Sequence, residues 1–236
     1  MMKFKTGIDM FNSTWLHYMN FQRHIYFFLF LSAISLSSLG QKMVHAPDLS
    51  KNENFQVVGR DLNVSAREGK IVVHLSARPN NGVVWIKGSN FTYGTISFDV
   101  KGKNVPQQSF VGVAFHKVND STYDAVYLRP FNFQSTDPVR KVHCVQYISL
   151  PQHEWFVLRD KFPGQYENGL QGNVDPESWV HVRITVEAGS IQVFINQDEK
   201  PSLVVQPLSI VGAGAIGFWV GNGSDGDFSN LSYQNH

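Results

Sequence analysis

The sequence predicts an all-β fold, namely an antiparallel two-sheet β-sandwich of the jelly-roll type. Three observations support this prediction. After the first forty residues, apolar and polar residues alternate in short runs, which is typical of strands with one buried face. Turn-forming residues separate these runs. Between residues 43 and 236, no segment keeps the 3.6-residue period of an amphipathic helix for three turns.

The alternation assigns an inward face to each expected strand. Strands are expected around residues 71–75, 95–100, 111–116, 126–129, 180–187, 191–195 and 216–220. The segments 79–82, 119–121, 188–190 and 196–198 are rich in turn formers and separate these strands. The predicted core between the sheets consists of Val113, Phe115, Val126, Leu128, Val182, Ile184, Val193, Ile195, Phe218 and Val220. Residues 151–176 do not alternate and are predicted to form a long loop with room for one helical turn.

The first forty residues differ from the rest of the chain. From Met19, a polar stretch containing Arg23 precedes the apolar block 25–31, and a small-residue tail ends at Gly40. This order is typical of a secretory signal peptide, and serines leave the apolar block too short for a membrane span of about 20 residues. We therefore expect a signal peptide in residues 1–40, with 1–18 as an upstream extension if Met19 is the true start. Residues 41–236 contain no internal repeat or linker and are expected to form a single secreted or periplasmic domain without a stable membrane span.

The charge balance and the cysteine content exclude several classes of protein. The whole chain has a formal net charge of +1, and the part after residue 40 is close to neutral. Such a balance offers no electrostatic footprint for nucleic acid or anionic lipid. Cys144 is the only cysteine and lies in a strand-like run, so a buried, inert thiol is expected rather than a reactive one. The histidines form no His-x-His or Glu-x-x-His pair, which argues against catalytic zinc.

Several strings of residues together resemble a known superfamily. They are SFDVKGK (97–103), FVGVAFH (110–116), YDAVYLRPFNF (123–133), DPVRKVHCVQYIS (137–149), WVHVRITVE (179–187), IQVFIN (191–196) and IGFWVGNGSDGDFSNL (216–231). In this order they resemble the concanavalin A-like lectin/glucanase superfamily, and within it exported bacterial domains named 3-keto-disaccharide hydrolase or family 16 glycoside hydrolase-like. The resemblance spans residues 55–234. It implies a sugar-binding groove on the concave outer face of one sheet, while one fold of this kind hosts lectins, hydrolases and lyases.

Alternating polar residues in two expected strands are candidates for such a groove. Tyr127 and Arg129 point away from the predicted core, and His143 and Tyr147 alternate in a following strand. Arginine supplies a fixed fork of donors for hydroxyl or carboxylate groups, and aromatic rings stack on sugar rings. The sequence does not decide whether Gln146 or Tyr147 faces the groove. The alternative is a sheet face covered by tyrosines, with Arg129 paired to a local acid.

The expected long loop supplies the remaining candidates. Trp155 and Tyr166 are predicted to roof the groove, and Glu154 and Glu167 are candidate catalytic carboxylates for acid/base work on a glycosidic bond. The alternative is that both are solvated loop acids and Trp155 closes the edge of the sandwich. The Glu-x-Asp-x-x-Glu motif of family 16 glucanases is absent, and Asp99 is the only carboxylate on the nearest comparable strand.

Two further motifs are weaker. Lys161, Gly164 and Tyr166 resemble the Lys-x-Gly-x-Tyr strand of jelly-roll polysaccharide lyases, but the Lys-to-Gly spacing is one residue longer here. The oxygen-rich run that contains Asn222, Asp225 and Asp227 is a candidate site for structural calcium. A glycine-rich turn capped by Asp explains the same run equally well. No cofactor is expected to be required.

These residues lead to one main functional hypothesis and two alternatives. We expect an exported domain that binds an oligo- or polysaccharide in a groove on one sheet. The first alternative is a glycoside hydrolase, or less favourably a polysaccharide lyase, that acts in the same groove. The second is a structural interaction module without a sugar site. An enzyme needs two convergent titratable groups in one cleft, whereas binding needs only aromatic platforms and hydrogen-bond donors.

Overall fold

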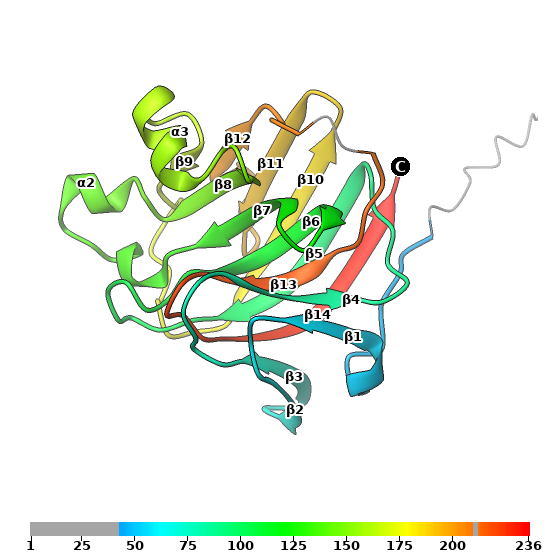
Figure 1. Ribbon diagram of the computed structural model, residues 1–236. Coiled ribbons are helices and arrows are strands. Elements are labelled where there is room, and N and C mark those ends of the chain that lie inside the picture. The colour runs from blue at the N-terminus through cyan, green and yellow to red at the C-terminus, as the bar shows by residue number, and fades with distance from the viewer. Residues whose placement is uncertain (1–42, 210–211) are drawn as a thin grey trace, which may run out of the picture. The chain divides into compact units, whose positions relative to one another are not determined.

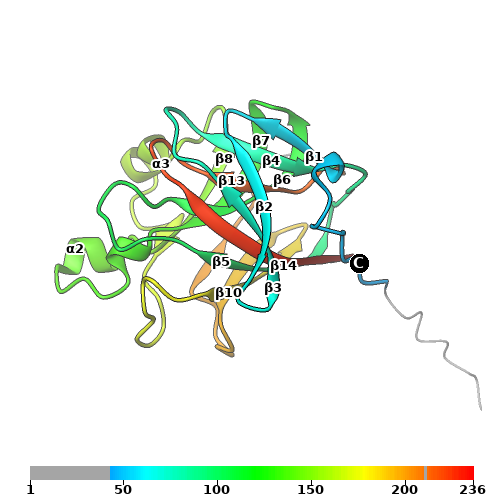
Figure 2. The ribbon, with the colours of Figure 1, turned by 90° about the horizontal axis from the view of Figure 1, so that it is seen from below.

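Two antiparallel sheets of seven strands each make up the described part of the chain, residues 43–209 and 212–236 of a computed structural model (Figure 1). Figure 2 shows the two layers from below, with β4, β6, β7 and β8 in one and β5, β10 and β3 in the other. The predicted two-sheet antiparallel sandwich is therefore confirmed. The signal peptide predicted in residues 1–40 lies outside the described residues.

The first sheet carries the candidate site, and the second supports it from behind. In spatial order, the first sheet contains β1 (Phe55–Val58), β4 (Gly82–Ile86), β13 (Gly217–Val220), β6 (Val111–Asn119), β7 (Thr122–Leu128), β8 (Val145–Leu150) and β9 (Glu167–Asn168). The second sheet contains β12 (Leu203–Val205), β11 (Ser190–Ile195), β10 (Val180–Glu187), β5 (Gly94–Lys101), β14 (Gly226–Asn235), β3 (Lys70–Leu75) and β2 (Leu62–Arg67).

Short helices occupy the connections. They are the 3-10 turns η1 (Asn52–Asn54) and η2 (Pro130–Asn132) and the helices α2 (Pro138–Lys141) and α3 (Trp155–Lys161). The Asp137 side chain caps α2 by accepting a hydrogen bond from the backbone of Val139, and Pro138 suits the first helical turn. The segment expected to be a long loop contains α3 and the short strand β9. None of the helices in the described ranges is long and apolar enough to cross a bilayer.

The core lies between the sheets and follows the predicted alternation. All ten residues predicted to face inward are buried. Phe218 of β13 and Phe228 of β14 belong to different sheets, and their rings stack with centroids 4.8 Å apart. The burial of large rings from both sheets is the main favourable term for this architecture, because apolar surface removed from water contributes roughly 25 cal/mol per Å².

The outer face of the first sheet is also covered with aromatic rings. Trp85, Tyr123, Tyr127 and Trp219, here called the aromatic floor, all point away from the inter-sheet core and are nearly inaccessible to solvent. Gly112 lies between Tyr127 and Trp219 in the strand register, and a Cβ there would come within 2.0 Å of the Val126 carbonyl oxygen. Glycine therefore lets the two rings meet above β6, with centroids 4.8 Å apart.

Cys144 lies just before β8 and is buried, as predicted. Its Sγ donates to the Lys141 carbonyl oxygen at 3.3 Å. Burial raises the pKa of the thiol to about 11. At neutral pH the group is therefore the protonated thiol, which is a poor nucleophile.

We expect Phe218→Ala to lower the free energy of unfolding by about 3–5 kcal/mol, because it removes a fully buried ring and leaves a cavity between the sheets. Urea denaturation of the described domain measures this loss. The matched control is Phe156→Ala, whose ring is 55% exposed and should change the midpoint little. Equal midpoints for both variants would contradict the assigned core.

Candidate binding site

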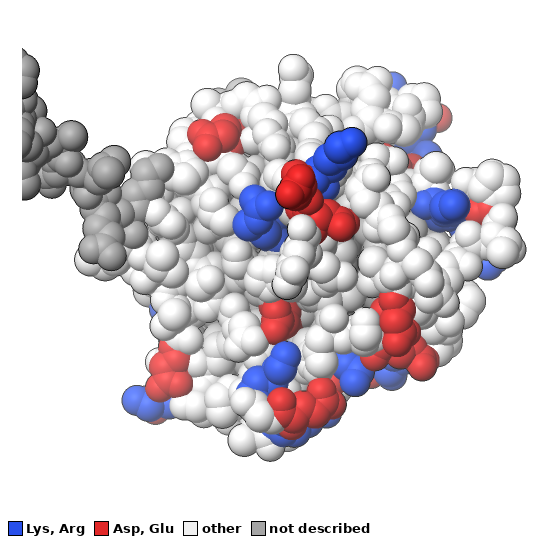
Figure 3. All heavy atoms as spheres, turned by 180° about the vertical axis from the view of Figure 1, so that it is seen from behind, with Lys and Arg blue, Asp and Glu red and all other residues white. Residues whose placement is uncertain are grey.

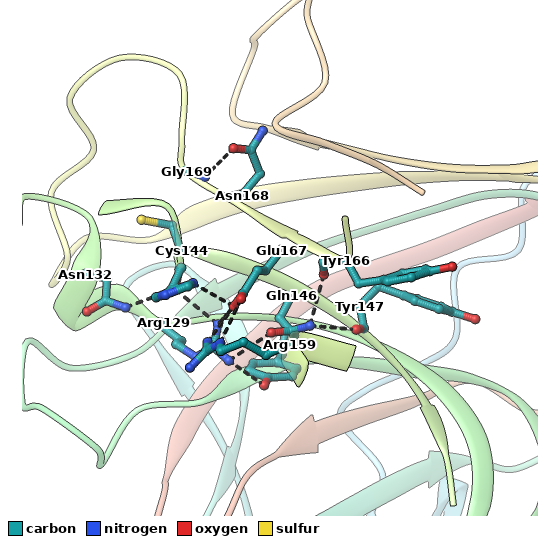
Figure 4. A network of polar contacts seen from close by, with 12 residues as sticks. Arg129, Asn132, Cys144, Gln146, Tyr147, Arg159, Tyr166, Glu167, Asn168 and Gly169 are labelled. Atoms are coloured by element: carbon teal, nitrogen blue, oxygen red, sulfur yellow. Dashed lines mark hydrogen bonds and ion pairs between the residues drawn. The ribbon is translucent and has the colours of Figure 1, made fainter. Parts of the chain in front are cut away.

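A buried polar cluster lies on the outer face of the first sheet, where β7, β8 and β9 run side by side (Figure 4). Tyr127 is paired with Gln146, and Gln146 is paired with Glu167, so these three side chains share one face. Arg129 follows directly after β7, and Arg159 comes from α3. The strand register thus brings together polar residues that are up to forty positions apart in the sequence.

Glu167 is at the centre of this cluster. Its carboxylate accepts two hydrogen bonds from Arg159, from Nε to Oε1 at 2.8 Å and from Nη2 to Oε2 at 2.6 Å. Arg129 Nη1 lies 3.6 Å from Oε2. Burial by itself would raise the pKa of Glu167, but the Arg159 hydrogen bonds and the charges of the neighbouring cations hold it below its usual value. Glu167 is therefore ionised at neutral pH.

Arg129 is 5% exposed and is fixed by neutral acceptors as well as by Glu167. Its Nη2 donates to the Tyr127 hydroxyl at 2.9 Å and to Gln146 Oε1 at 3.1 Å, and its Nη1 donates to the His143 carbonyl at 3.2 Å. Gln146 is held in turn, because its Nε2 donates to the carbonyls of Tyr147 and Tyr166. The orientation of Arg129 is therefore set before any ligand arrives.

His143 borders the same carboxylate. Its Nδ1 lies 2.8 Å from Glu167 Oε2, at ion-pair distance but without the geometry of a hydrogen bond. Burial lowers the pKa of His143, Glu167 opposes this shift, and Arg159 and Arg129 add to it, so the net direction is downward. The imidazole is therefore neutral at neutral pH, and the charge of Glu167 is shared by the two arginines.

A pocket of about 470 Å³ opens beside this cluster. We call it the arginine pocket. Its polar wall contains Arg129, Arg140, His143 and Arg159, its apolar wall contains Phe110, Phe131 and Trp155, and the amides of Gln107, Asn132 and Asn222 complete the lining with Pro106 and Val139. Trp155 is 43% exposed, and the Arg159 guanidinium lies 5.0 Å from the centroid of its ring. The pocket therefore combines fixed donors with an accessible aromatic face.

The structure brings Arg129, His143 and Trp155 to this pocket, with Glu167 behind the guanidiniums. Tyr127 belongs to the aromatic floor below and supports Arg129. Arg159, Phe110 and Phe131 complete the site and were not predicted. Gln146, which the sequence left open as the alternative to Tyr147, also faces it. Only the pairing of Tyr127 with Gln146 decides between Gln146 and Tyr147. Nothing in the sequence pairs Arg159 with Glu167, because their contact depends on how α3 folds back.

The structure corrects the expected positions of Tyr147 and Tyr166. Tyr147 pairs with Val126, so it faces the inter-sheet core, where its hydroxyl donates to Asp124 Oδ1 at 3.0 Å. Tyr166 packs beside it, with ring centroids 5.9 Å apart. Figure 4 shows both rings directed away from Arg129 and Glu167. Tyr166 contributes only its backbone carbonyl, which accepts from Gln146.

The two candidate catalytic carboxylates have different environments. Glu154 precedes α3 and is half-buried, and burial raises its pKa. Within the described residues it has no ion pair or hydrogen bond through its side chain. Glu167 has the opposite shift and is occupied by arginine. Since a general acid must hold a proton at working pH, the lowered pKa of Glu167 argues against that role.

The three candidate calcium ligands have other partners. Asn222 Oδ1 accepts from the backbone of Asn80 at 2.7 Å, and Asp225 pairs with Lys103 at 2.6 Å. Asp227 Oδ1 lies 2.7 Å from Arg67 Nη2 and 2.6 Å from His74 Nδ1. In the ranges that the structure describes, no three His, Cys, Asp or Glu side chains converge as metal ligands would. Each of the three side chains therefore has a protein partner in this arrangement, and the calcium site stays a prediction.

We expect Glu167→Gln to lower the free energy of unfolding by about 2–3 kcal/mol. The amide leaves two guanidiniums without a counter-ion, and the loss is smaller than the about 3–5 kcal/mol of a fully buried pair because Arg159 is partly exposed. Urea denaturation at pH 7 measures it, with Glu177→Gln as the exposed control. An unchanged midpoint for Glu167→Gln would contradict the central role of this carboxylate.

Acidification should destabilise the domain in part through His143. Its pKa is lower in the folded state than in the unfolded state, so unfolded chains bind more protons and stability falls as the pH drops below about 6.5. The difference in melting temperature between pH 7.5 and 5.5 should therefore be smaller in His143→Gln than in the unaltered protein. His45→Gln is the control, because His45 lies outside the cluster. Identical pH profiles for His143→Gln and the unaltered protein would contradict the direction of this shift.

Comparisons with known proteins concern the fold. No family model matches the chain. No curated protein matches it in sequence. Similar solved structures include carbohydrate-binding module CBM66 from Bacillus subtilis, at 12% identity and a TM-score of 0.53, with 77% of this chain and 95% of that chain covered. A second is a protein of unknown function with a galectin-like fold from Bacillus subtilis, at 14% identity and a TM-score of 0.51, with 81% and 98% covered.

A third similar structure is the exoplasmic/lumenal domain of VIP36 in its Ca²⁺/Man3GlcNAc-bound form, at 12% identity and a TM-score of 0.49, with 80% of this chain and 89% of that chain covered. At such identities a likeness concerns the fold alone. The carbohydrate-binding module and the galectin-like protein share the sandwich fold that the resemblance noted in the sequence implies.

Proposed function

We propose that this chain is an exported carbohydrate-binding domain whose site is the arginine pocket. The observation that carries the proposal is the accessible Trp155 ring beside guanidinium groups that are already fixed by Glu167, Tyr127 and Gln146. Sugar rings present apolar faces that stack on aromatic side chains and edges that form hydrogen bonds. A preformed site loses little conformational entropy when a ligand binds. This helps the site to bind sugars, which are polar ligands that bind weakly.

The fold and the position of the pocket support this proposal. A carbohydrate-binding module shares the fold, and the pocket lies on the outer face of one sheet, away from the core. The volume of about 470 Å³ falls in the range of small-ligand sites and suits one or two sugar rings. Export through the predicted signal peptide fits a protein that meets polysaccharide outside the cytoplasm, and it remains part of the proposal.

One observation favours hydrolysis as a second candidate function. Burial raises the pKa of Glu154, whereas arginine lowers the pKa of Glu167, and opposite shifts are typical of a general acid and its partner. We favour binding over hydrolysis because both oxygens of Glu167 are engaged by Arg159. Glu154 also does not line the arginine pocket.

Trp155→Ala should weaken binding of the best glycan from an array by about five- to thirtyfold, because it removes about 1–2 kcal/mol of ring stacking. Isothermal titration calorimetry measures the change. Phe156→Ala is the matched control, since Phe156 is the next residue of α3, is 55% exposed against 43% for Trp155, and does not line the pocket. Equal losses for both variants would place the sugar elsewhere, and binding to no glycan would favour the structural interaction module.

Incubation with the same glycans separates binding from catalysis. We expect no new reducing ends and no unsaturated products over a day at pH 5 to 8. If products form and Glu154→Gln abolishes them while the affinity is retained, the domain is a hydrolase and the binding-only proposal is wrong.

A further inference from the structure

The charge of the arginine pocket is positive and is only partly compensated. Arg129, Arg140 and Arg159 line it, and none of the described residues in its lining is Asp or Glu. Glu167 lies behind the pocket and supplies one negative charge for two guanidiniums. Arg140 has only a long contact with Asp137, 3.8 Å across the exposed surface of α2. A surplus of positive charge therefore faces the pocket.

The outer face of the second sheet differs from the arginine pocket in its distribution of charge. Figure 3, which views the molecule from behind, shows acidic and basic side chains next to one another on that face. Asp99 lies 3.3 Å from Lys70 and 2.8 Å from His181, and Asp227 pairs with Arg67. Charges that serve only solubility are interspersed in this way. The unbalanced arginines of the pocket are thus not a general property of this surface.

The donors of the pocket are also incompletely used. Within the described residues, no acceptor is bonded to Arg129 Nε or to Arg159 Nη1. This is so although Arg129 is only 5% exposed. Both guanidiniums contact the same atom, Glu167 Oε2, at 3.6 and 2.6 Å. Glu167 therefore holds two cations close together that would otherwise repel each other, and their remaining donors are available to a ligand.

A ligand that complements this wall must accept hydrogen bonds and carry negative charge. Arginine has only donors. Of the three amide oxygens in the lining, Asn222 Oδ1 already accepts from Asn80, which leaves those of Gln107 and Asn132 as side-chain amide acceptors against three guanidiniums. Hydroxyl groups of a neutral sugar could use these two acceptors, but they would leave the surplus positive charge of the pocket unbalanced. Carboxylate and sulfate groups are acceptors only, and the arginine fork fits both.

We propose that the arginine pocket recognises a sugar residue bearing a carboxylate or a sulfate group, with that group on Arg129 and Arg159 and the sugar ring against Trp155. This inference rests on the proposed carbohydrate-binding function and adds the chemical class of the ligand. The surplus charge on Arg140, at the rim, attracts the same anion. Because His143 is neutral, the negative charge of Glu167 is balanced by the two arginines alone.

The test uses glycans in matched acidic and neutral forms. One arm compares oligogalacturonate, alginate and hyaluronan oligosaccharides with their carboxyl-reduced counterparts, and the other compares sulfated galactans with desulfated ones. The acidic form of at least one pair should bind at least about tenfold more tightly than its neutral form. Its affinity should also fall several-fold between 50 and 500 mM NaCl, as the charges are screened. The arm that responds identifies the anionic group.

A variant at the rim tests the role of charge without disturbing the buried cluster. Arg140→Gln should weaken binding of the acidic glycan about three- to tenfold, and clearly more than it weakens binding of the neutral counterpart. Lys141→Gln is the matched control, because Lys141 is the next residue of α2, is equally exposed and does not line the pocket. Equal effects of the two variants would mean general attraction to a basic surface and would contradict the proposal.

The outcomes separate this inference from the proposed function. A neutral glycan that binds as tightly as its acidic form, and is lost in Trp155→Ala, would overturn the inference and support the proposed function. Binding to no glycan would overturn both.

Discussion

The carboxylate of Glu167 is the interaction on which the candidate site depends. It belongs to β9, a strand of two residues, and it connects that strand to α3 through Arg159 and to the end of β7 through Arg129. Three separate segments are thus joined by one charge. Because a buried carboxylate without counter-ions would be unfavourable, the same contacts that fix the arginines also make Glu167 tolerable in the interior. As a consequence, Glu167 has little freedom to take part in proton transfer.

The sandwich supplies a rigid support for this cluster. Its inter-sheet core is built from alternating apolar residues, while the outer face of the first sheet carries the aromatic floor. Trp219 Nε1 donates to the Tyr123 hydroxyl at 3.2 Å, and Tyr127 accepts from Arg129, so the floor also satisfies its own polar atoms. A buried polar network with satisfied partners holds its members in one arrangement. Arg129 therefore reaches the pocket from a rigid part of the sheet rather than from a mobile loop.

Binding and catalysis make different demands on such a site. A binding site needs fixed donors and an aromatic face, and both are present beside a cavity of about 470 Å³. Acid/base catalysis needs a carboxyl group that can lose and regain a proton next to the scissile bond. Of the two candidate carboxylates, Glu154 alone has its pKa raised, and Glu167 is held ionised by arginine. Our proposal of recognition rather than bond cleavage therefore rests on the engagement of both Glu167 oxygens by Arg159.

The sequence by itself determined the fold class, the inward-facing core and the buried cysteine, because alternation with a period of two is a local property that survives folding. It also identified Arg129, His143, Trp155 and Glu167 as residues of interest. Only the tertiary structure decided which of them meet. A shift of one residue in pairing turns every side chain of a strand to the other face, so the β7–β8 register placed Gln146 at the site and Tyr147 in the core. The partnership of Glu167 with Arg159 required α3 to pack beside β8, so that Arg159 meets the carboxylate of β9, and no local pattern encodes a contact between separate elements.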